Sequence, residues 1–172
     1  MRPERIIRAN PPRVEADDWT HVEDTGAPVP EGRAIVPLAT WQAHRETLLG
    51  REGIGVWLAS DDDPESLRSD LAAVSVIAVH FPKAADGRGY STAVHLRRAG
   101  FRGELRAFGD IGRDHLFSLL RCGFDSFQLP PPRDPQAALA AFGEFTLRYQ
   151  GSIDDPSPLF RRREATSGAS HG

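Results

Sequence analysis

One loop in the middle of the sequence has the composition of an anion-binding site. It runs Phe81-Pro-Lys-Ala-Ala-Asp-Gly-Arg-Gly-Tyr-Ser91 and follows a strongly apolar segment, so it should lie beyond the carboxyl end of a strand. It contains two cations and two glycines, and the helix expected after it would begin with free main-chain N–H groups. These features predict a site for a small oxyanion or a phosphate-bearing ligand, formed by Lys83, Gly87, Arg88, Gly89 and Ser91. The alternative is a tight turn that carries a surface charge pair.

A second loop, Gly109-Asp-Ile-Gly-Arg-Asp-His115, follows the next predicted strand. Asp110 can cap the helix expected after it. Arg113 falls in the first turn of that helix, where a cation opposes the helix dipole unless an anion offsets it. Either Asp114 or a bound ligand would be that anion, so Arg113 is a further candidate for ligand binding.

Three side chains of these loops are candidates for catalysis: Asp86, Tyr90 and Asp110. The two carboxylates could orient the cations, and the phenol could donate a proton. Asp125 falls inside a predicted strand, where a salt bridge is favoured over acid–base chemistry. Its candidate partners are Arg88, Arg106 and Arg121. His80 ends the buried strand and is interpreted as a structural histidine.

The sequence indicates no metal and identifies no cofactor. The six histidines lack metal-ligand spacing, and the single cysteine, Cys122, excludes an all-cysteine zinc or iron–sulfur site within one chain. Neither Gly53-Ile-Gly55 nor Gly87-Arg-Gly89 forms a dinucleotide-binding fingerprint. The cofactor therefore stays unknown, and a flavin, which needs no such signature, remains open.

The composition argues against several classes of protein. The chain has 172 residues and a net charge of −3, without the basic excess of a nucleic-acid-binding protein. No apolar run approaches the about 20 residues of a membrane-spanning helix, and no secretory signal is recognisable. One cysteine fits a reducing compartment, so a cytoplasmic location is expected.

From Arg33 onward, short apolar runs alternate with helical patterns at intervals of roughly 20–25 residues, which is typical of βα units around a parallel sheet. The predicted strands are 34–37, 54–59, 74–81, 104–108 and 124–129. Strand 74–81 is almost continuously apolar and should be central, whereas strand 104–108 alternates and should be more exposed. Helices are predicted at 41–49 with Thr40 as cap, after Asp63-Pro64, at 89–98, at 111–121 and after Asp134-Pro135.

Five or so βα units are too few for a closed eight-stranded barrel. The sequence therefore predicts a single α/β domain, residues 34–150, with a parallel sheet of about five strands and flanking helices. A flavodoxin-like open sheet is favoured, and a partial βα barrel is the alternative. Residues 1–33 are interpreted as an extended or loosely attached N-terminal arm with a short strand near Arg5–Ala9, and residues 151–172 as a disordered C-terminal tail.

Segments in and around the two loops resemble a bacterial family of unknown function whose members are described as oxidoreductases of sulfite reduction. The resemblance rests on Phe81-Pro-Lys83, Asp86-Gly-Arg-Gly-Tyr-Ser91, Gly103-Glu-Leu-Arg-Ala107, Gly109-Asp110, Arg113-Asp114 and Arg121-Cys-Gly-Phe-Asp125. Family members often carry glutamine at the position of His115. They are typically encoded beside assimilatory sulfite reductase, so the resemblance implies a role in cytoplasmic sulfur assimilation towards cysteine.

Three functions are compatible with the loops and the resemblance. The first is an accessory enzyme or oxidoreductase component of sulfite reduction that binds an oxyanion or a phosphate-bearing ligand through Lys83, Arg88 and Arg113. The second is a non-catalytic partner that docks on sulfite reductase or its electron donor, using the N-terminal arm and residues 158–163. The third is a binding module that senses a sulfur metabolite.

Overall fold

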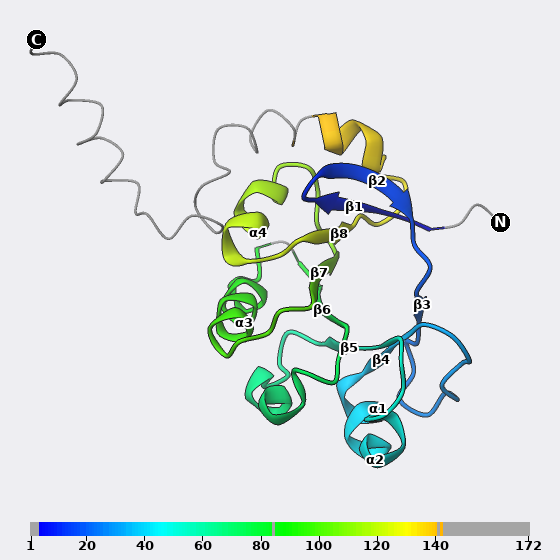
Figure 1. The fold of residues 1–172 in the computed structure, drawn as a ribbon. Coiled ribbons are helices and arrows are strands. Elements are labelled where there is room, and N and C mark those ends of the chain that lie inside the picture. Colours follow the sequence, from blue (N-terminus) through cyan, green and yellow to red (C-terminus); the bar gives the residue numbers. More distant parts are fainter. Residues whose placement is uncertain (1–3, 84, 141, 143–172) are drawn as a thin grey trace, which may run out of the picture.

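The computed structural model describes residues 4–83, 85–140 and 142. Eight strands lie within this part of the chain: β1 (Arg5–Ala9), β2 (Pro12–Ala16), β3 (Thr20–His21), β4 (Ala34–Pro37), β5 (Ile54–Leu58), β6 (Val76–Phe81), β7 (Glu104–Gly109) and β8 (Ser126–Gln128). They form one sheet in the order β2-β1-β8-β7-β6-β5-β4-β3 (Figure 1). Strands β3 to β8 are parallel, and β1 and β2 add an antiparallel pair beside β8. The sheet is therefore larger than the predicted five strands, and it is mixed.

The five predicted strands correspond to β4 to β8, most of them with slightly shifted ends. Strand β6 pairs with β5 on one side and β7 on the other, and five of its six residues are buried. A strand covered on both faces needs apolar side chains in both directions, which is why the continuous apolar run of this segment predicted its position correctly.

The N-terminal residues belong to the sheet. The predicted strand at Arg5–Ala9 is confirmed as β1, which pairs with β8 and buries Ile6 and Ile7. Strands β2 and β3 were not predicted, and they pair with β1 and β4. This segment is thus packed into the fold and is not a loosely attached arm.

The helices of the described residues are α1 (Leu38–Ala43), α2 (Arg45–Leu48), the 3₁₀ helix η1 (Pro64–Asp70), α3 (Gly87–Arg98) and α4 (Leu116–Cys122), and residues 135–140 and 142 are also helical. Asp63 and Asp134 cap the helices after them, as predicted, because each carboxylate accepts a main-chain N–H two residues further on. Thr40 is not a cap: it lies inside α1, and its hydroxyl donates to the carbonyl of Thr25.

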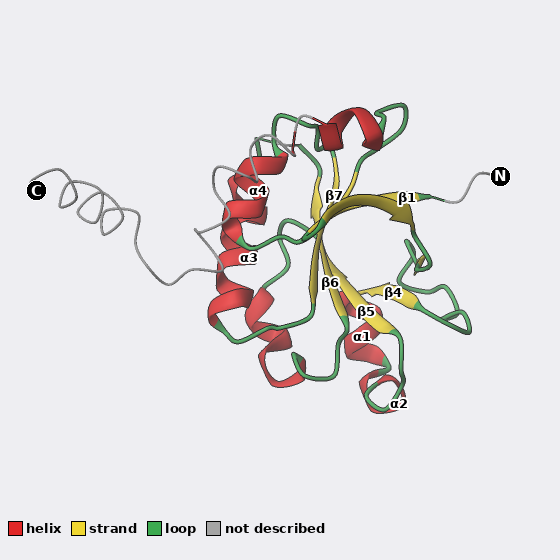
Figure 2. Ribbon diagram, turned by 45° about the horizontal axis from the view of Figure 1, so that its top comes forward, coloured by secondary structure: helices red, strands yellow, loops and turns green. Residues whose placement is uncertain are grey.

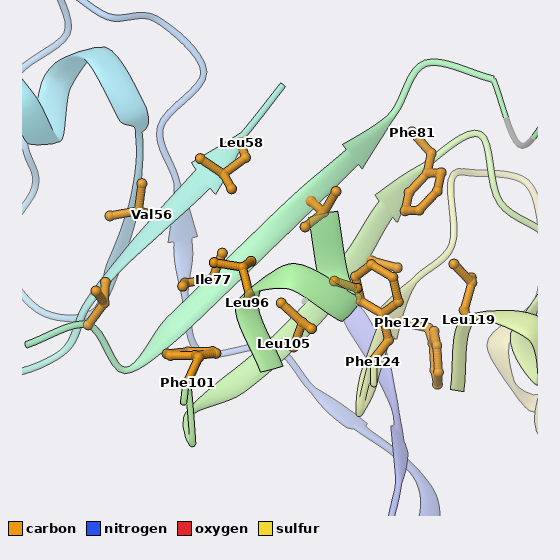
Figure 3. Close-up of a cluster of buried hydrophobic side chains, with 14 of the residues drawn as sticks. Val56, Leu58, Ile77, Phe81, Leu96, Phe101, Leu105, Leu119, Phe124 and Phe127 are labelled. Atoms are coloured by element: carbon orange, nitrogen blue, oxygen red, sulfur yellow. The ribbon is translucent and has the colours of Figure 1, made fainter. Parts of the chain in front are cut away.

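The helices cover one face of the sheet, called here the outer face. Strand residues such as Val56, Ile77 and Leu105 form one hydrophobic core with Leu96 of α3 and Leu119 of α4 (Figure 3). Members of every other described helix, and of the helical residues 135–140 and 142, belong to the same core. Burial of this continuous apolar surface is the main force that holds helices and sheet together.

The opposite face, called the inner face, carries its own small cluster. This cluster is built on Ile35, Val76 and Ala78, with Trp19, Trp57 and Phe108 packed against it, and no helix residue is among its members. The sheet curls around this face into a half-barrel (Figure 2). The α/β class, the single domain and the flanking helices are confirmed. The favoured flavodoxin-like sheet is not observed, because such a sheet has helices on both faces, and the partial barrel is the better description.

Among the described residues, no helix has the length and apolar character needed to cross a membrane. The predicted C-terminal tail, residues 151–172, lies outside the described residues, and so do residues 143–150 at the expected end of the domain.

Candidate functional site

The loop after β6 is arranged around the side chain of Asp86. This residue caps α3, and its Oδ1 accepts the main-chain N–H of Arg88 at 3.1 Å. The same carboxylate binds the Arg88 guanidinium, with Nε–Oδ1 at 3.0 Å and Nη2–Oδ2 at 2.7 Å. These hydrogen bonds hold the pKa of Asp86 below its ordinary value, so Asp86 is an ionised group that positions Arg88 and not a proton donor. Arg88 lies exposed beside it.

The glycines and Tyr90 of this loop have packing roles. A Cβ at Gly89 would lie 2.5 Å from the ring of Phe81, so this position requires glycine, whereas Gly87 has open space around it. The Tyr90 ring meets Phe81 edge-on at 5.3 Å, and burial raises the pKa of the phenol. Tyr90 and Ser91 border a surface cavity of about 480 Å³ beside α4, where Cys122 also lies. Tyr90 therefore keeps its proton at neutral pH.

The loop after β7 is joined directly to the loop after β6. The main-chain N–H of Asp110 donates to the carbonyl of Phe81 at 2.7 Å. Gly109 makes this approach possible: its φ is +105°, and a Cβ there would lie 2.3 Å from the same carbonyl oxygen. The two candidate loops thus meet at the carboxyl edge of the sheet, as the positions of β6 and β7 predicted.

Two predicted roles in the second loop are corrected. Asp110 does not cap α4, because its carboxylate instead lies 3.2 Å from the guanidinium of Arg133. Arg113 is not in the first helical turn, because α4 begins only at Leu116. A turn closed by the hydrogen bond from the Gly112 N–H to Nδ1 of His115 (3.0 Å) occupies the intervening residues. Arg113 is exposed in this turn and does not oppose the helix dipole.

Lys83 and Arg113 are the cations of the two loops that are left available. Both side chains are exposed, and neither has an ion-pair partner in the described part of the chain. Arg88 is neutralised by its ion pair with Asp86 and adds no net charge to these two cations. Among the described residues, no cluster of His, Cys, Asp and Glu could hold a metal ion.

Asp125 lies elsewhere and has a different partner from those expected. Its Oδ2 is 3.0 Å from Nη2 of Arg97 on α3, and its Oδ1 accepts the main-chain N–H of Leu105 at 2.9 Å. The predicted salt bridge exists, but Arg88, Arg106 and Arg121 do not form it. Asp125 precedes β8, at the amino edge of the sheet, so it is removed from the two loops.

Sequence reasoning missed a group of aromatic rings on the inner face. Phe108 of β7 lies between two imidazoles, with ring centroids 4.6 Å from His21 and 4.9 Å from His80. Trp57 of β5 is more distant, with its ring centroid 6.0 Å from that of Phe108 and the two rings nearly perpendicular. Neither imidazole makes a hydrogen bond within the described residues. Side chains along a strand point alternately to the two faces of the sheet, which places Trp57, His80 and Phe108 on the same face. This alternation was the signal from which the group could have been predicted.

Both imidazoles are neutral at physiological pH. Burial, followed by the positive charge of Arg106, lowers the pKa of His21 to about 4. Burial also lowers the pKa of His80. A neutral imidazole offers one hydrogen-bond donor and one acceptor, so the inner face presents polar ring atoms in an aromatic setting.

A buried ion pair lies next to this group. Arg106 of β7 has no exposed side-chain surface, and it contacts Asp17 with Nη1–Oδ2 at 2.6 Å. Glu104 accepts from Nε of Arg106 at 2.9 Å and from the Ser126 hydroxyl at 2.6 Å. Burial alone would raise the pKa of Glu104, but Arg106, Ser126 and Arg8 together outweigh it and hold that pKa below its ordinary value. Strand β7 is more exposed than β6, as predicted, with three of its six residues buried against five of six, but the Arg106 side chain is fully buried in contact with Asp17.

Comparison with known proteins gives a family without an assigned activity. A family model described as "Bacterial protein of unknown function (DUF934)" matches residues 55–160, which is more than half of the chain. The match begins within β5 and includes β6 to β8 and both candidate loops. No curated protein matches the chain.

Proposed function

The chain belongs to a family of bacterial proteins of unknown function (DUF934), and we propose that it acts in assimilatory sulfite reduction as an accessory enzyme or oxidoreductase component. In this proposal an oxyanion or a phosphate-bearing ligand binds at the carboxyl edge of the sheet, between the loops after β6 and β7. The resemblance to proteins of sulfite reduction, carried mainly by these loops, supports the pathway. The geometry supports the position of the site.

One observation carries the proposed site: the 2.7 Å hydrogen bond from Asp110 to Phe81, which brings the two loops together. It places the exposed cations Lys83 and Arg113 on loops that share one edge of the sheet. Arginine and lysine side chains that lack an ion pair are suited to bind a small anion such as sulfite, which would provide the missing negative charge.

In this proposal the side chains of the protein bind the anion and orient it, and they do not carry out the redox step themselves. Redox chemistry at sulfur needs a cofactor or a thiol pair, because protein side chains do not carry hydrides or electrons well. Asp86 forms an ion pair with Arg88, for which a bound anion would compete, and Asp110 lies 3.2 Å from the guanidinium of Arg133. Tyr90, whose pKa is raised by burial, keeps the one phenolic proton that the loop could donate.

Thermal unfolding in the presence of sulfite tests the proposed site. A bound ligand stabilises the native state by mass action, so sulfite should raise the Tm of the wild-type chain. The double variant Lys83→Ala/Arg113→Ala should lose this shift. Arg102→Ala is the matched control, because Arg102 is an exposed arginine that precedes β7, at the opposite edge. An equal shift in all three proteins would contradict the proposal, and so would no shift in the wild type.

A docking function is the second candidate, and the inner face favours it. No helix of the described residues covers this face, and Trp19, Trp57 and Phe108 are only partly buried there. Sulfite reductase or its electron donor would be the partner. Co-purification of either with the wild-type chain, and its loss in Phe108→Gln, would support docking. Absence of both partners from a pull-down would leave the accessory enzyme as the better account.

A further inference from the structure

A cavity of about 640 Å³ opens at the carboxyl ends of β7 and β8. Phe108 and Gly109 form its wall on β7, and Gln128 forms its wall on β8. Four prolines, at positions 130, 131, 132 and 135, complete the apolar surface. The volume is in the range of small-molecule sites, and ligands of parallel α/β proteins bind at this end of the strands. The cations proposed above to bind sulfite do not line this cavity.

Two polar groups at the cavity have unmet binding capacity. Gln128 lines it, and its Oε1 is buried without a hydrogen-bond partner among the described residues. Its Nε2 is already used, because it donates to Oε2 of Glu4 at 2.8 Å. Arg5 also lines the cavity, and its guanidinium has no ion-pair partner in the described part of the chain. The other cation, Arg133, is held by Asp110 and the carbonyl of Ile111. Within the described residues, Gln128 Oε1 therefore lacks a donor and Arg5 lacks an ion-pair partner, although Glu4 and Asp134 also line the cavity.

We propose that this cavity binds a planar nitrogen heterocycle that carries a phosphate group, as in a mononucleotide. Phenyl and proline rings give the flat apolar surfaces against which a heterocycle packs. A ring N–H of the ligand supplies the hydrogen bond that Oε1 of Gln128 lacks. The phosphate pairs with Arg5, whose guanidinium can bind two phosphate oxygens at once. This ligand goes beyond the sulfite proposal and depends on different residues.

Titration calorimetry with matched ligand pairs tests the proposal. The probes are flavin mononucleotide with riboflavin, and inosine monophosphate with inosine, each pair carrying a ring N–H and differing by the phosphate. At least one nucleotide should bind the full chain about tenfold more tightly than its nucleoside, which corresponds to one charge-assisted contact. Arg5→Met should abolish this preference and leave nucleoside binding unchanged. Gln128→Met should weaken nucleotide and nucleoside about tenfold alike, because both carry the ring N–H. Arg102→Met should bind like the wild type.

Three results would overturn the proposal. The first is the absence of saturable binding of both nucleotides to the wild-type chain. The second is an Arg5→Met variant that keeps the full preference for the phosphorylated ligand. The third is unchanged binding in Gln128→Met. Far-ultraviolet circular dichroism of each variant confirms that the fold is intact, and the sulfite experiment has no influence on any of these outcomes.

Discussion

The imidazole of His21 contacts the phenyl ring of Phe108 at a centroid distance of 4.6 Å, although three strands separate β3 from β7 in the sheet. Neighbouring strands lie about 4.8 Å apart, so in a flat sheet these two strands would be about 19 Å apart. The contact therefore requires the curl of the half-barrel. The N-terminal segment therefore places the His21 ring on the inner face, beside the carboxyl half of the central strands.

The buried pair of Asp17 and Arg106 should contribute strongly to stability. Asp17→Ala removes the main partner of the Arg106 guanidinium, which has no exposed surface. We expect the free energy of unfolding to fall by about 3 kcal/mol. Asp18→Ala is the control, because Asp18 forms an exposed pair with Arg33 and should cost less than about 1 kcal/mol. Urea unfolding monitored by tryptophan fluorescence measures both. Equal losses in the two variants would contradict the assigned burial.

His21 should make stability depend on pH. Its pKa in the folded chain is about 4, below the ordinary 6.5, so the unfolded chain binds the additional proton first as pH falls. The stabilisation is complete above pH 6.5 and is lost as pH falls from there toward 4, by up to about 3 kcal/mol. His21→Phe keeps the ring contact without the titration. As pH falls from 6.5 toward 4, the unfolding free energy of the wild type should therefore decrease relative to that of His21→Phe. A difference between the two proteins that does not change with pH would show that His21 does not titrate as described.

Glycine is required at position 89 and optional at position 87. Gly89→Ala would press a methyl group against the buried Phe81 ring, where the nearest ring atoms are 2.5 Å away, and should cost about 1–3 kcal/mol. A Cβ added at position 87 would have no atom within 4 Å, so Gly87→Ala should be neutral or stabilise α3 by up to about 1 kcal/mol. Thermal and urea unfolding of the two variants compare them directly. A Gly89→Ala protein as stable as Gly87→Ala would contradict the packing.

Asp86 should compete with a bound anion for Arg88. Asn caps a helix about as well as Asp, so Asp86→Asn should fold normally while losing one negative charge beside Arg88. Removing repulsion between charges about 4 Å apart in water should tighten sulfite binding about fivefold. Titration calorimetry gives the affinity. Weaker binding in Asp86→Asn would mean that the carboxylate orients Arg88 for the ligand.

Sequence patterns were sufficient for the central strands and for the location of the two loops. The continuous apolar run of β6 and the capping residues Asp63 and Asp134 act locally, over a few neighbours, so they can be predicted from the sequence. Strand order then placed the loops after β6 and β7 at one edge. The contact of Asp110 with Phe81 confirms this local inference.

The curl and the inner face could not be predicted in the same way. They depend on contacts between residues far apart in sequence, such as Arg106 with Asp17, 89 positions away. Nothing near Arg106 in the sequence shows that Asp17 is its partner or that its side chain is fully buried. Strand β3 has only two residues, too few for any pattern to predict. The rings of His21 and Phe108 were missed for the same reason.

Growth of a deletion strain on sulfite and on sulfide as sole sulfur sources tests the central claim most directly. A protein of the sulfite-to-sulfide step is needed on sulfite and dispensable on sulfide. We predict that the deletion strain grows only on sulfide, and that the wild-type gene and Arg102→Ala restore growth on sulfite whereas Lys83→Ala/Arg113→Ala does not. Equal growth of the deletion strain on both sulfur sources would contradict a role at this step.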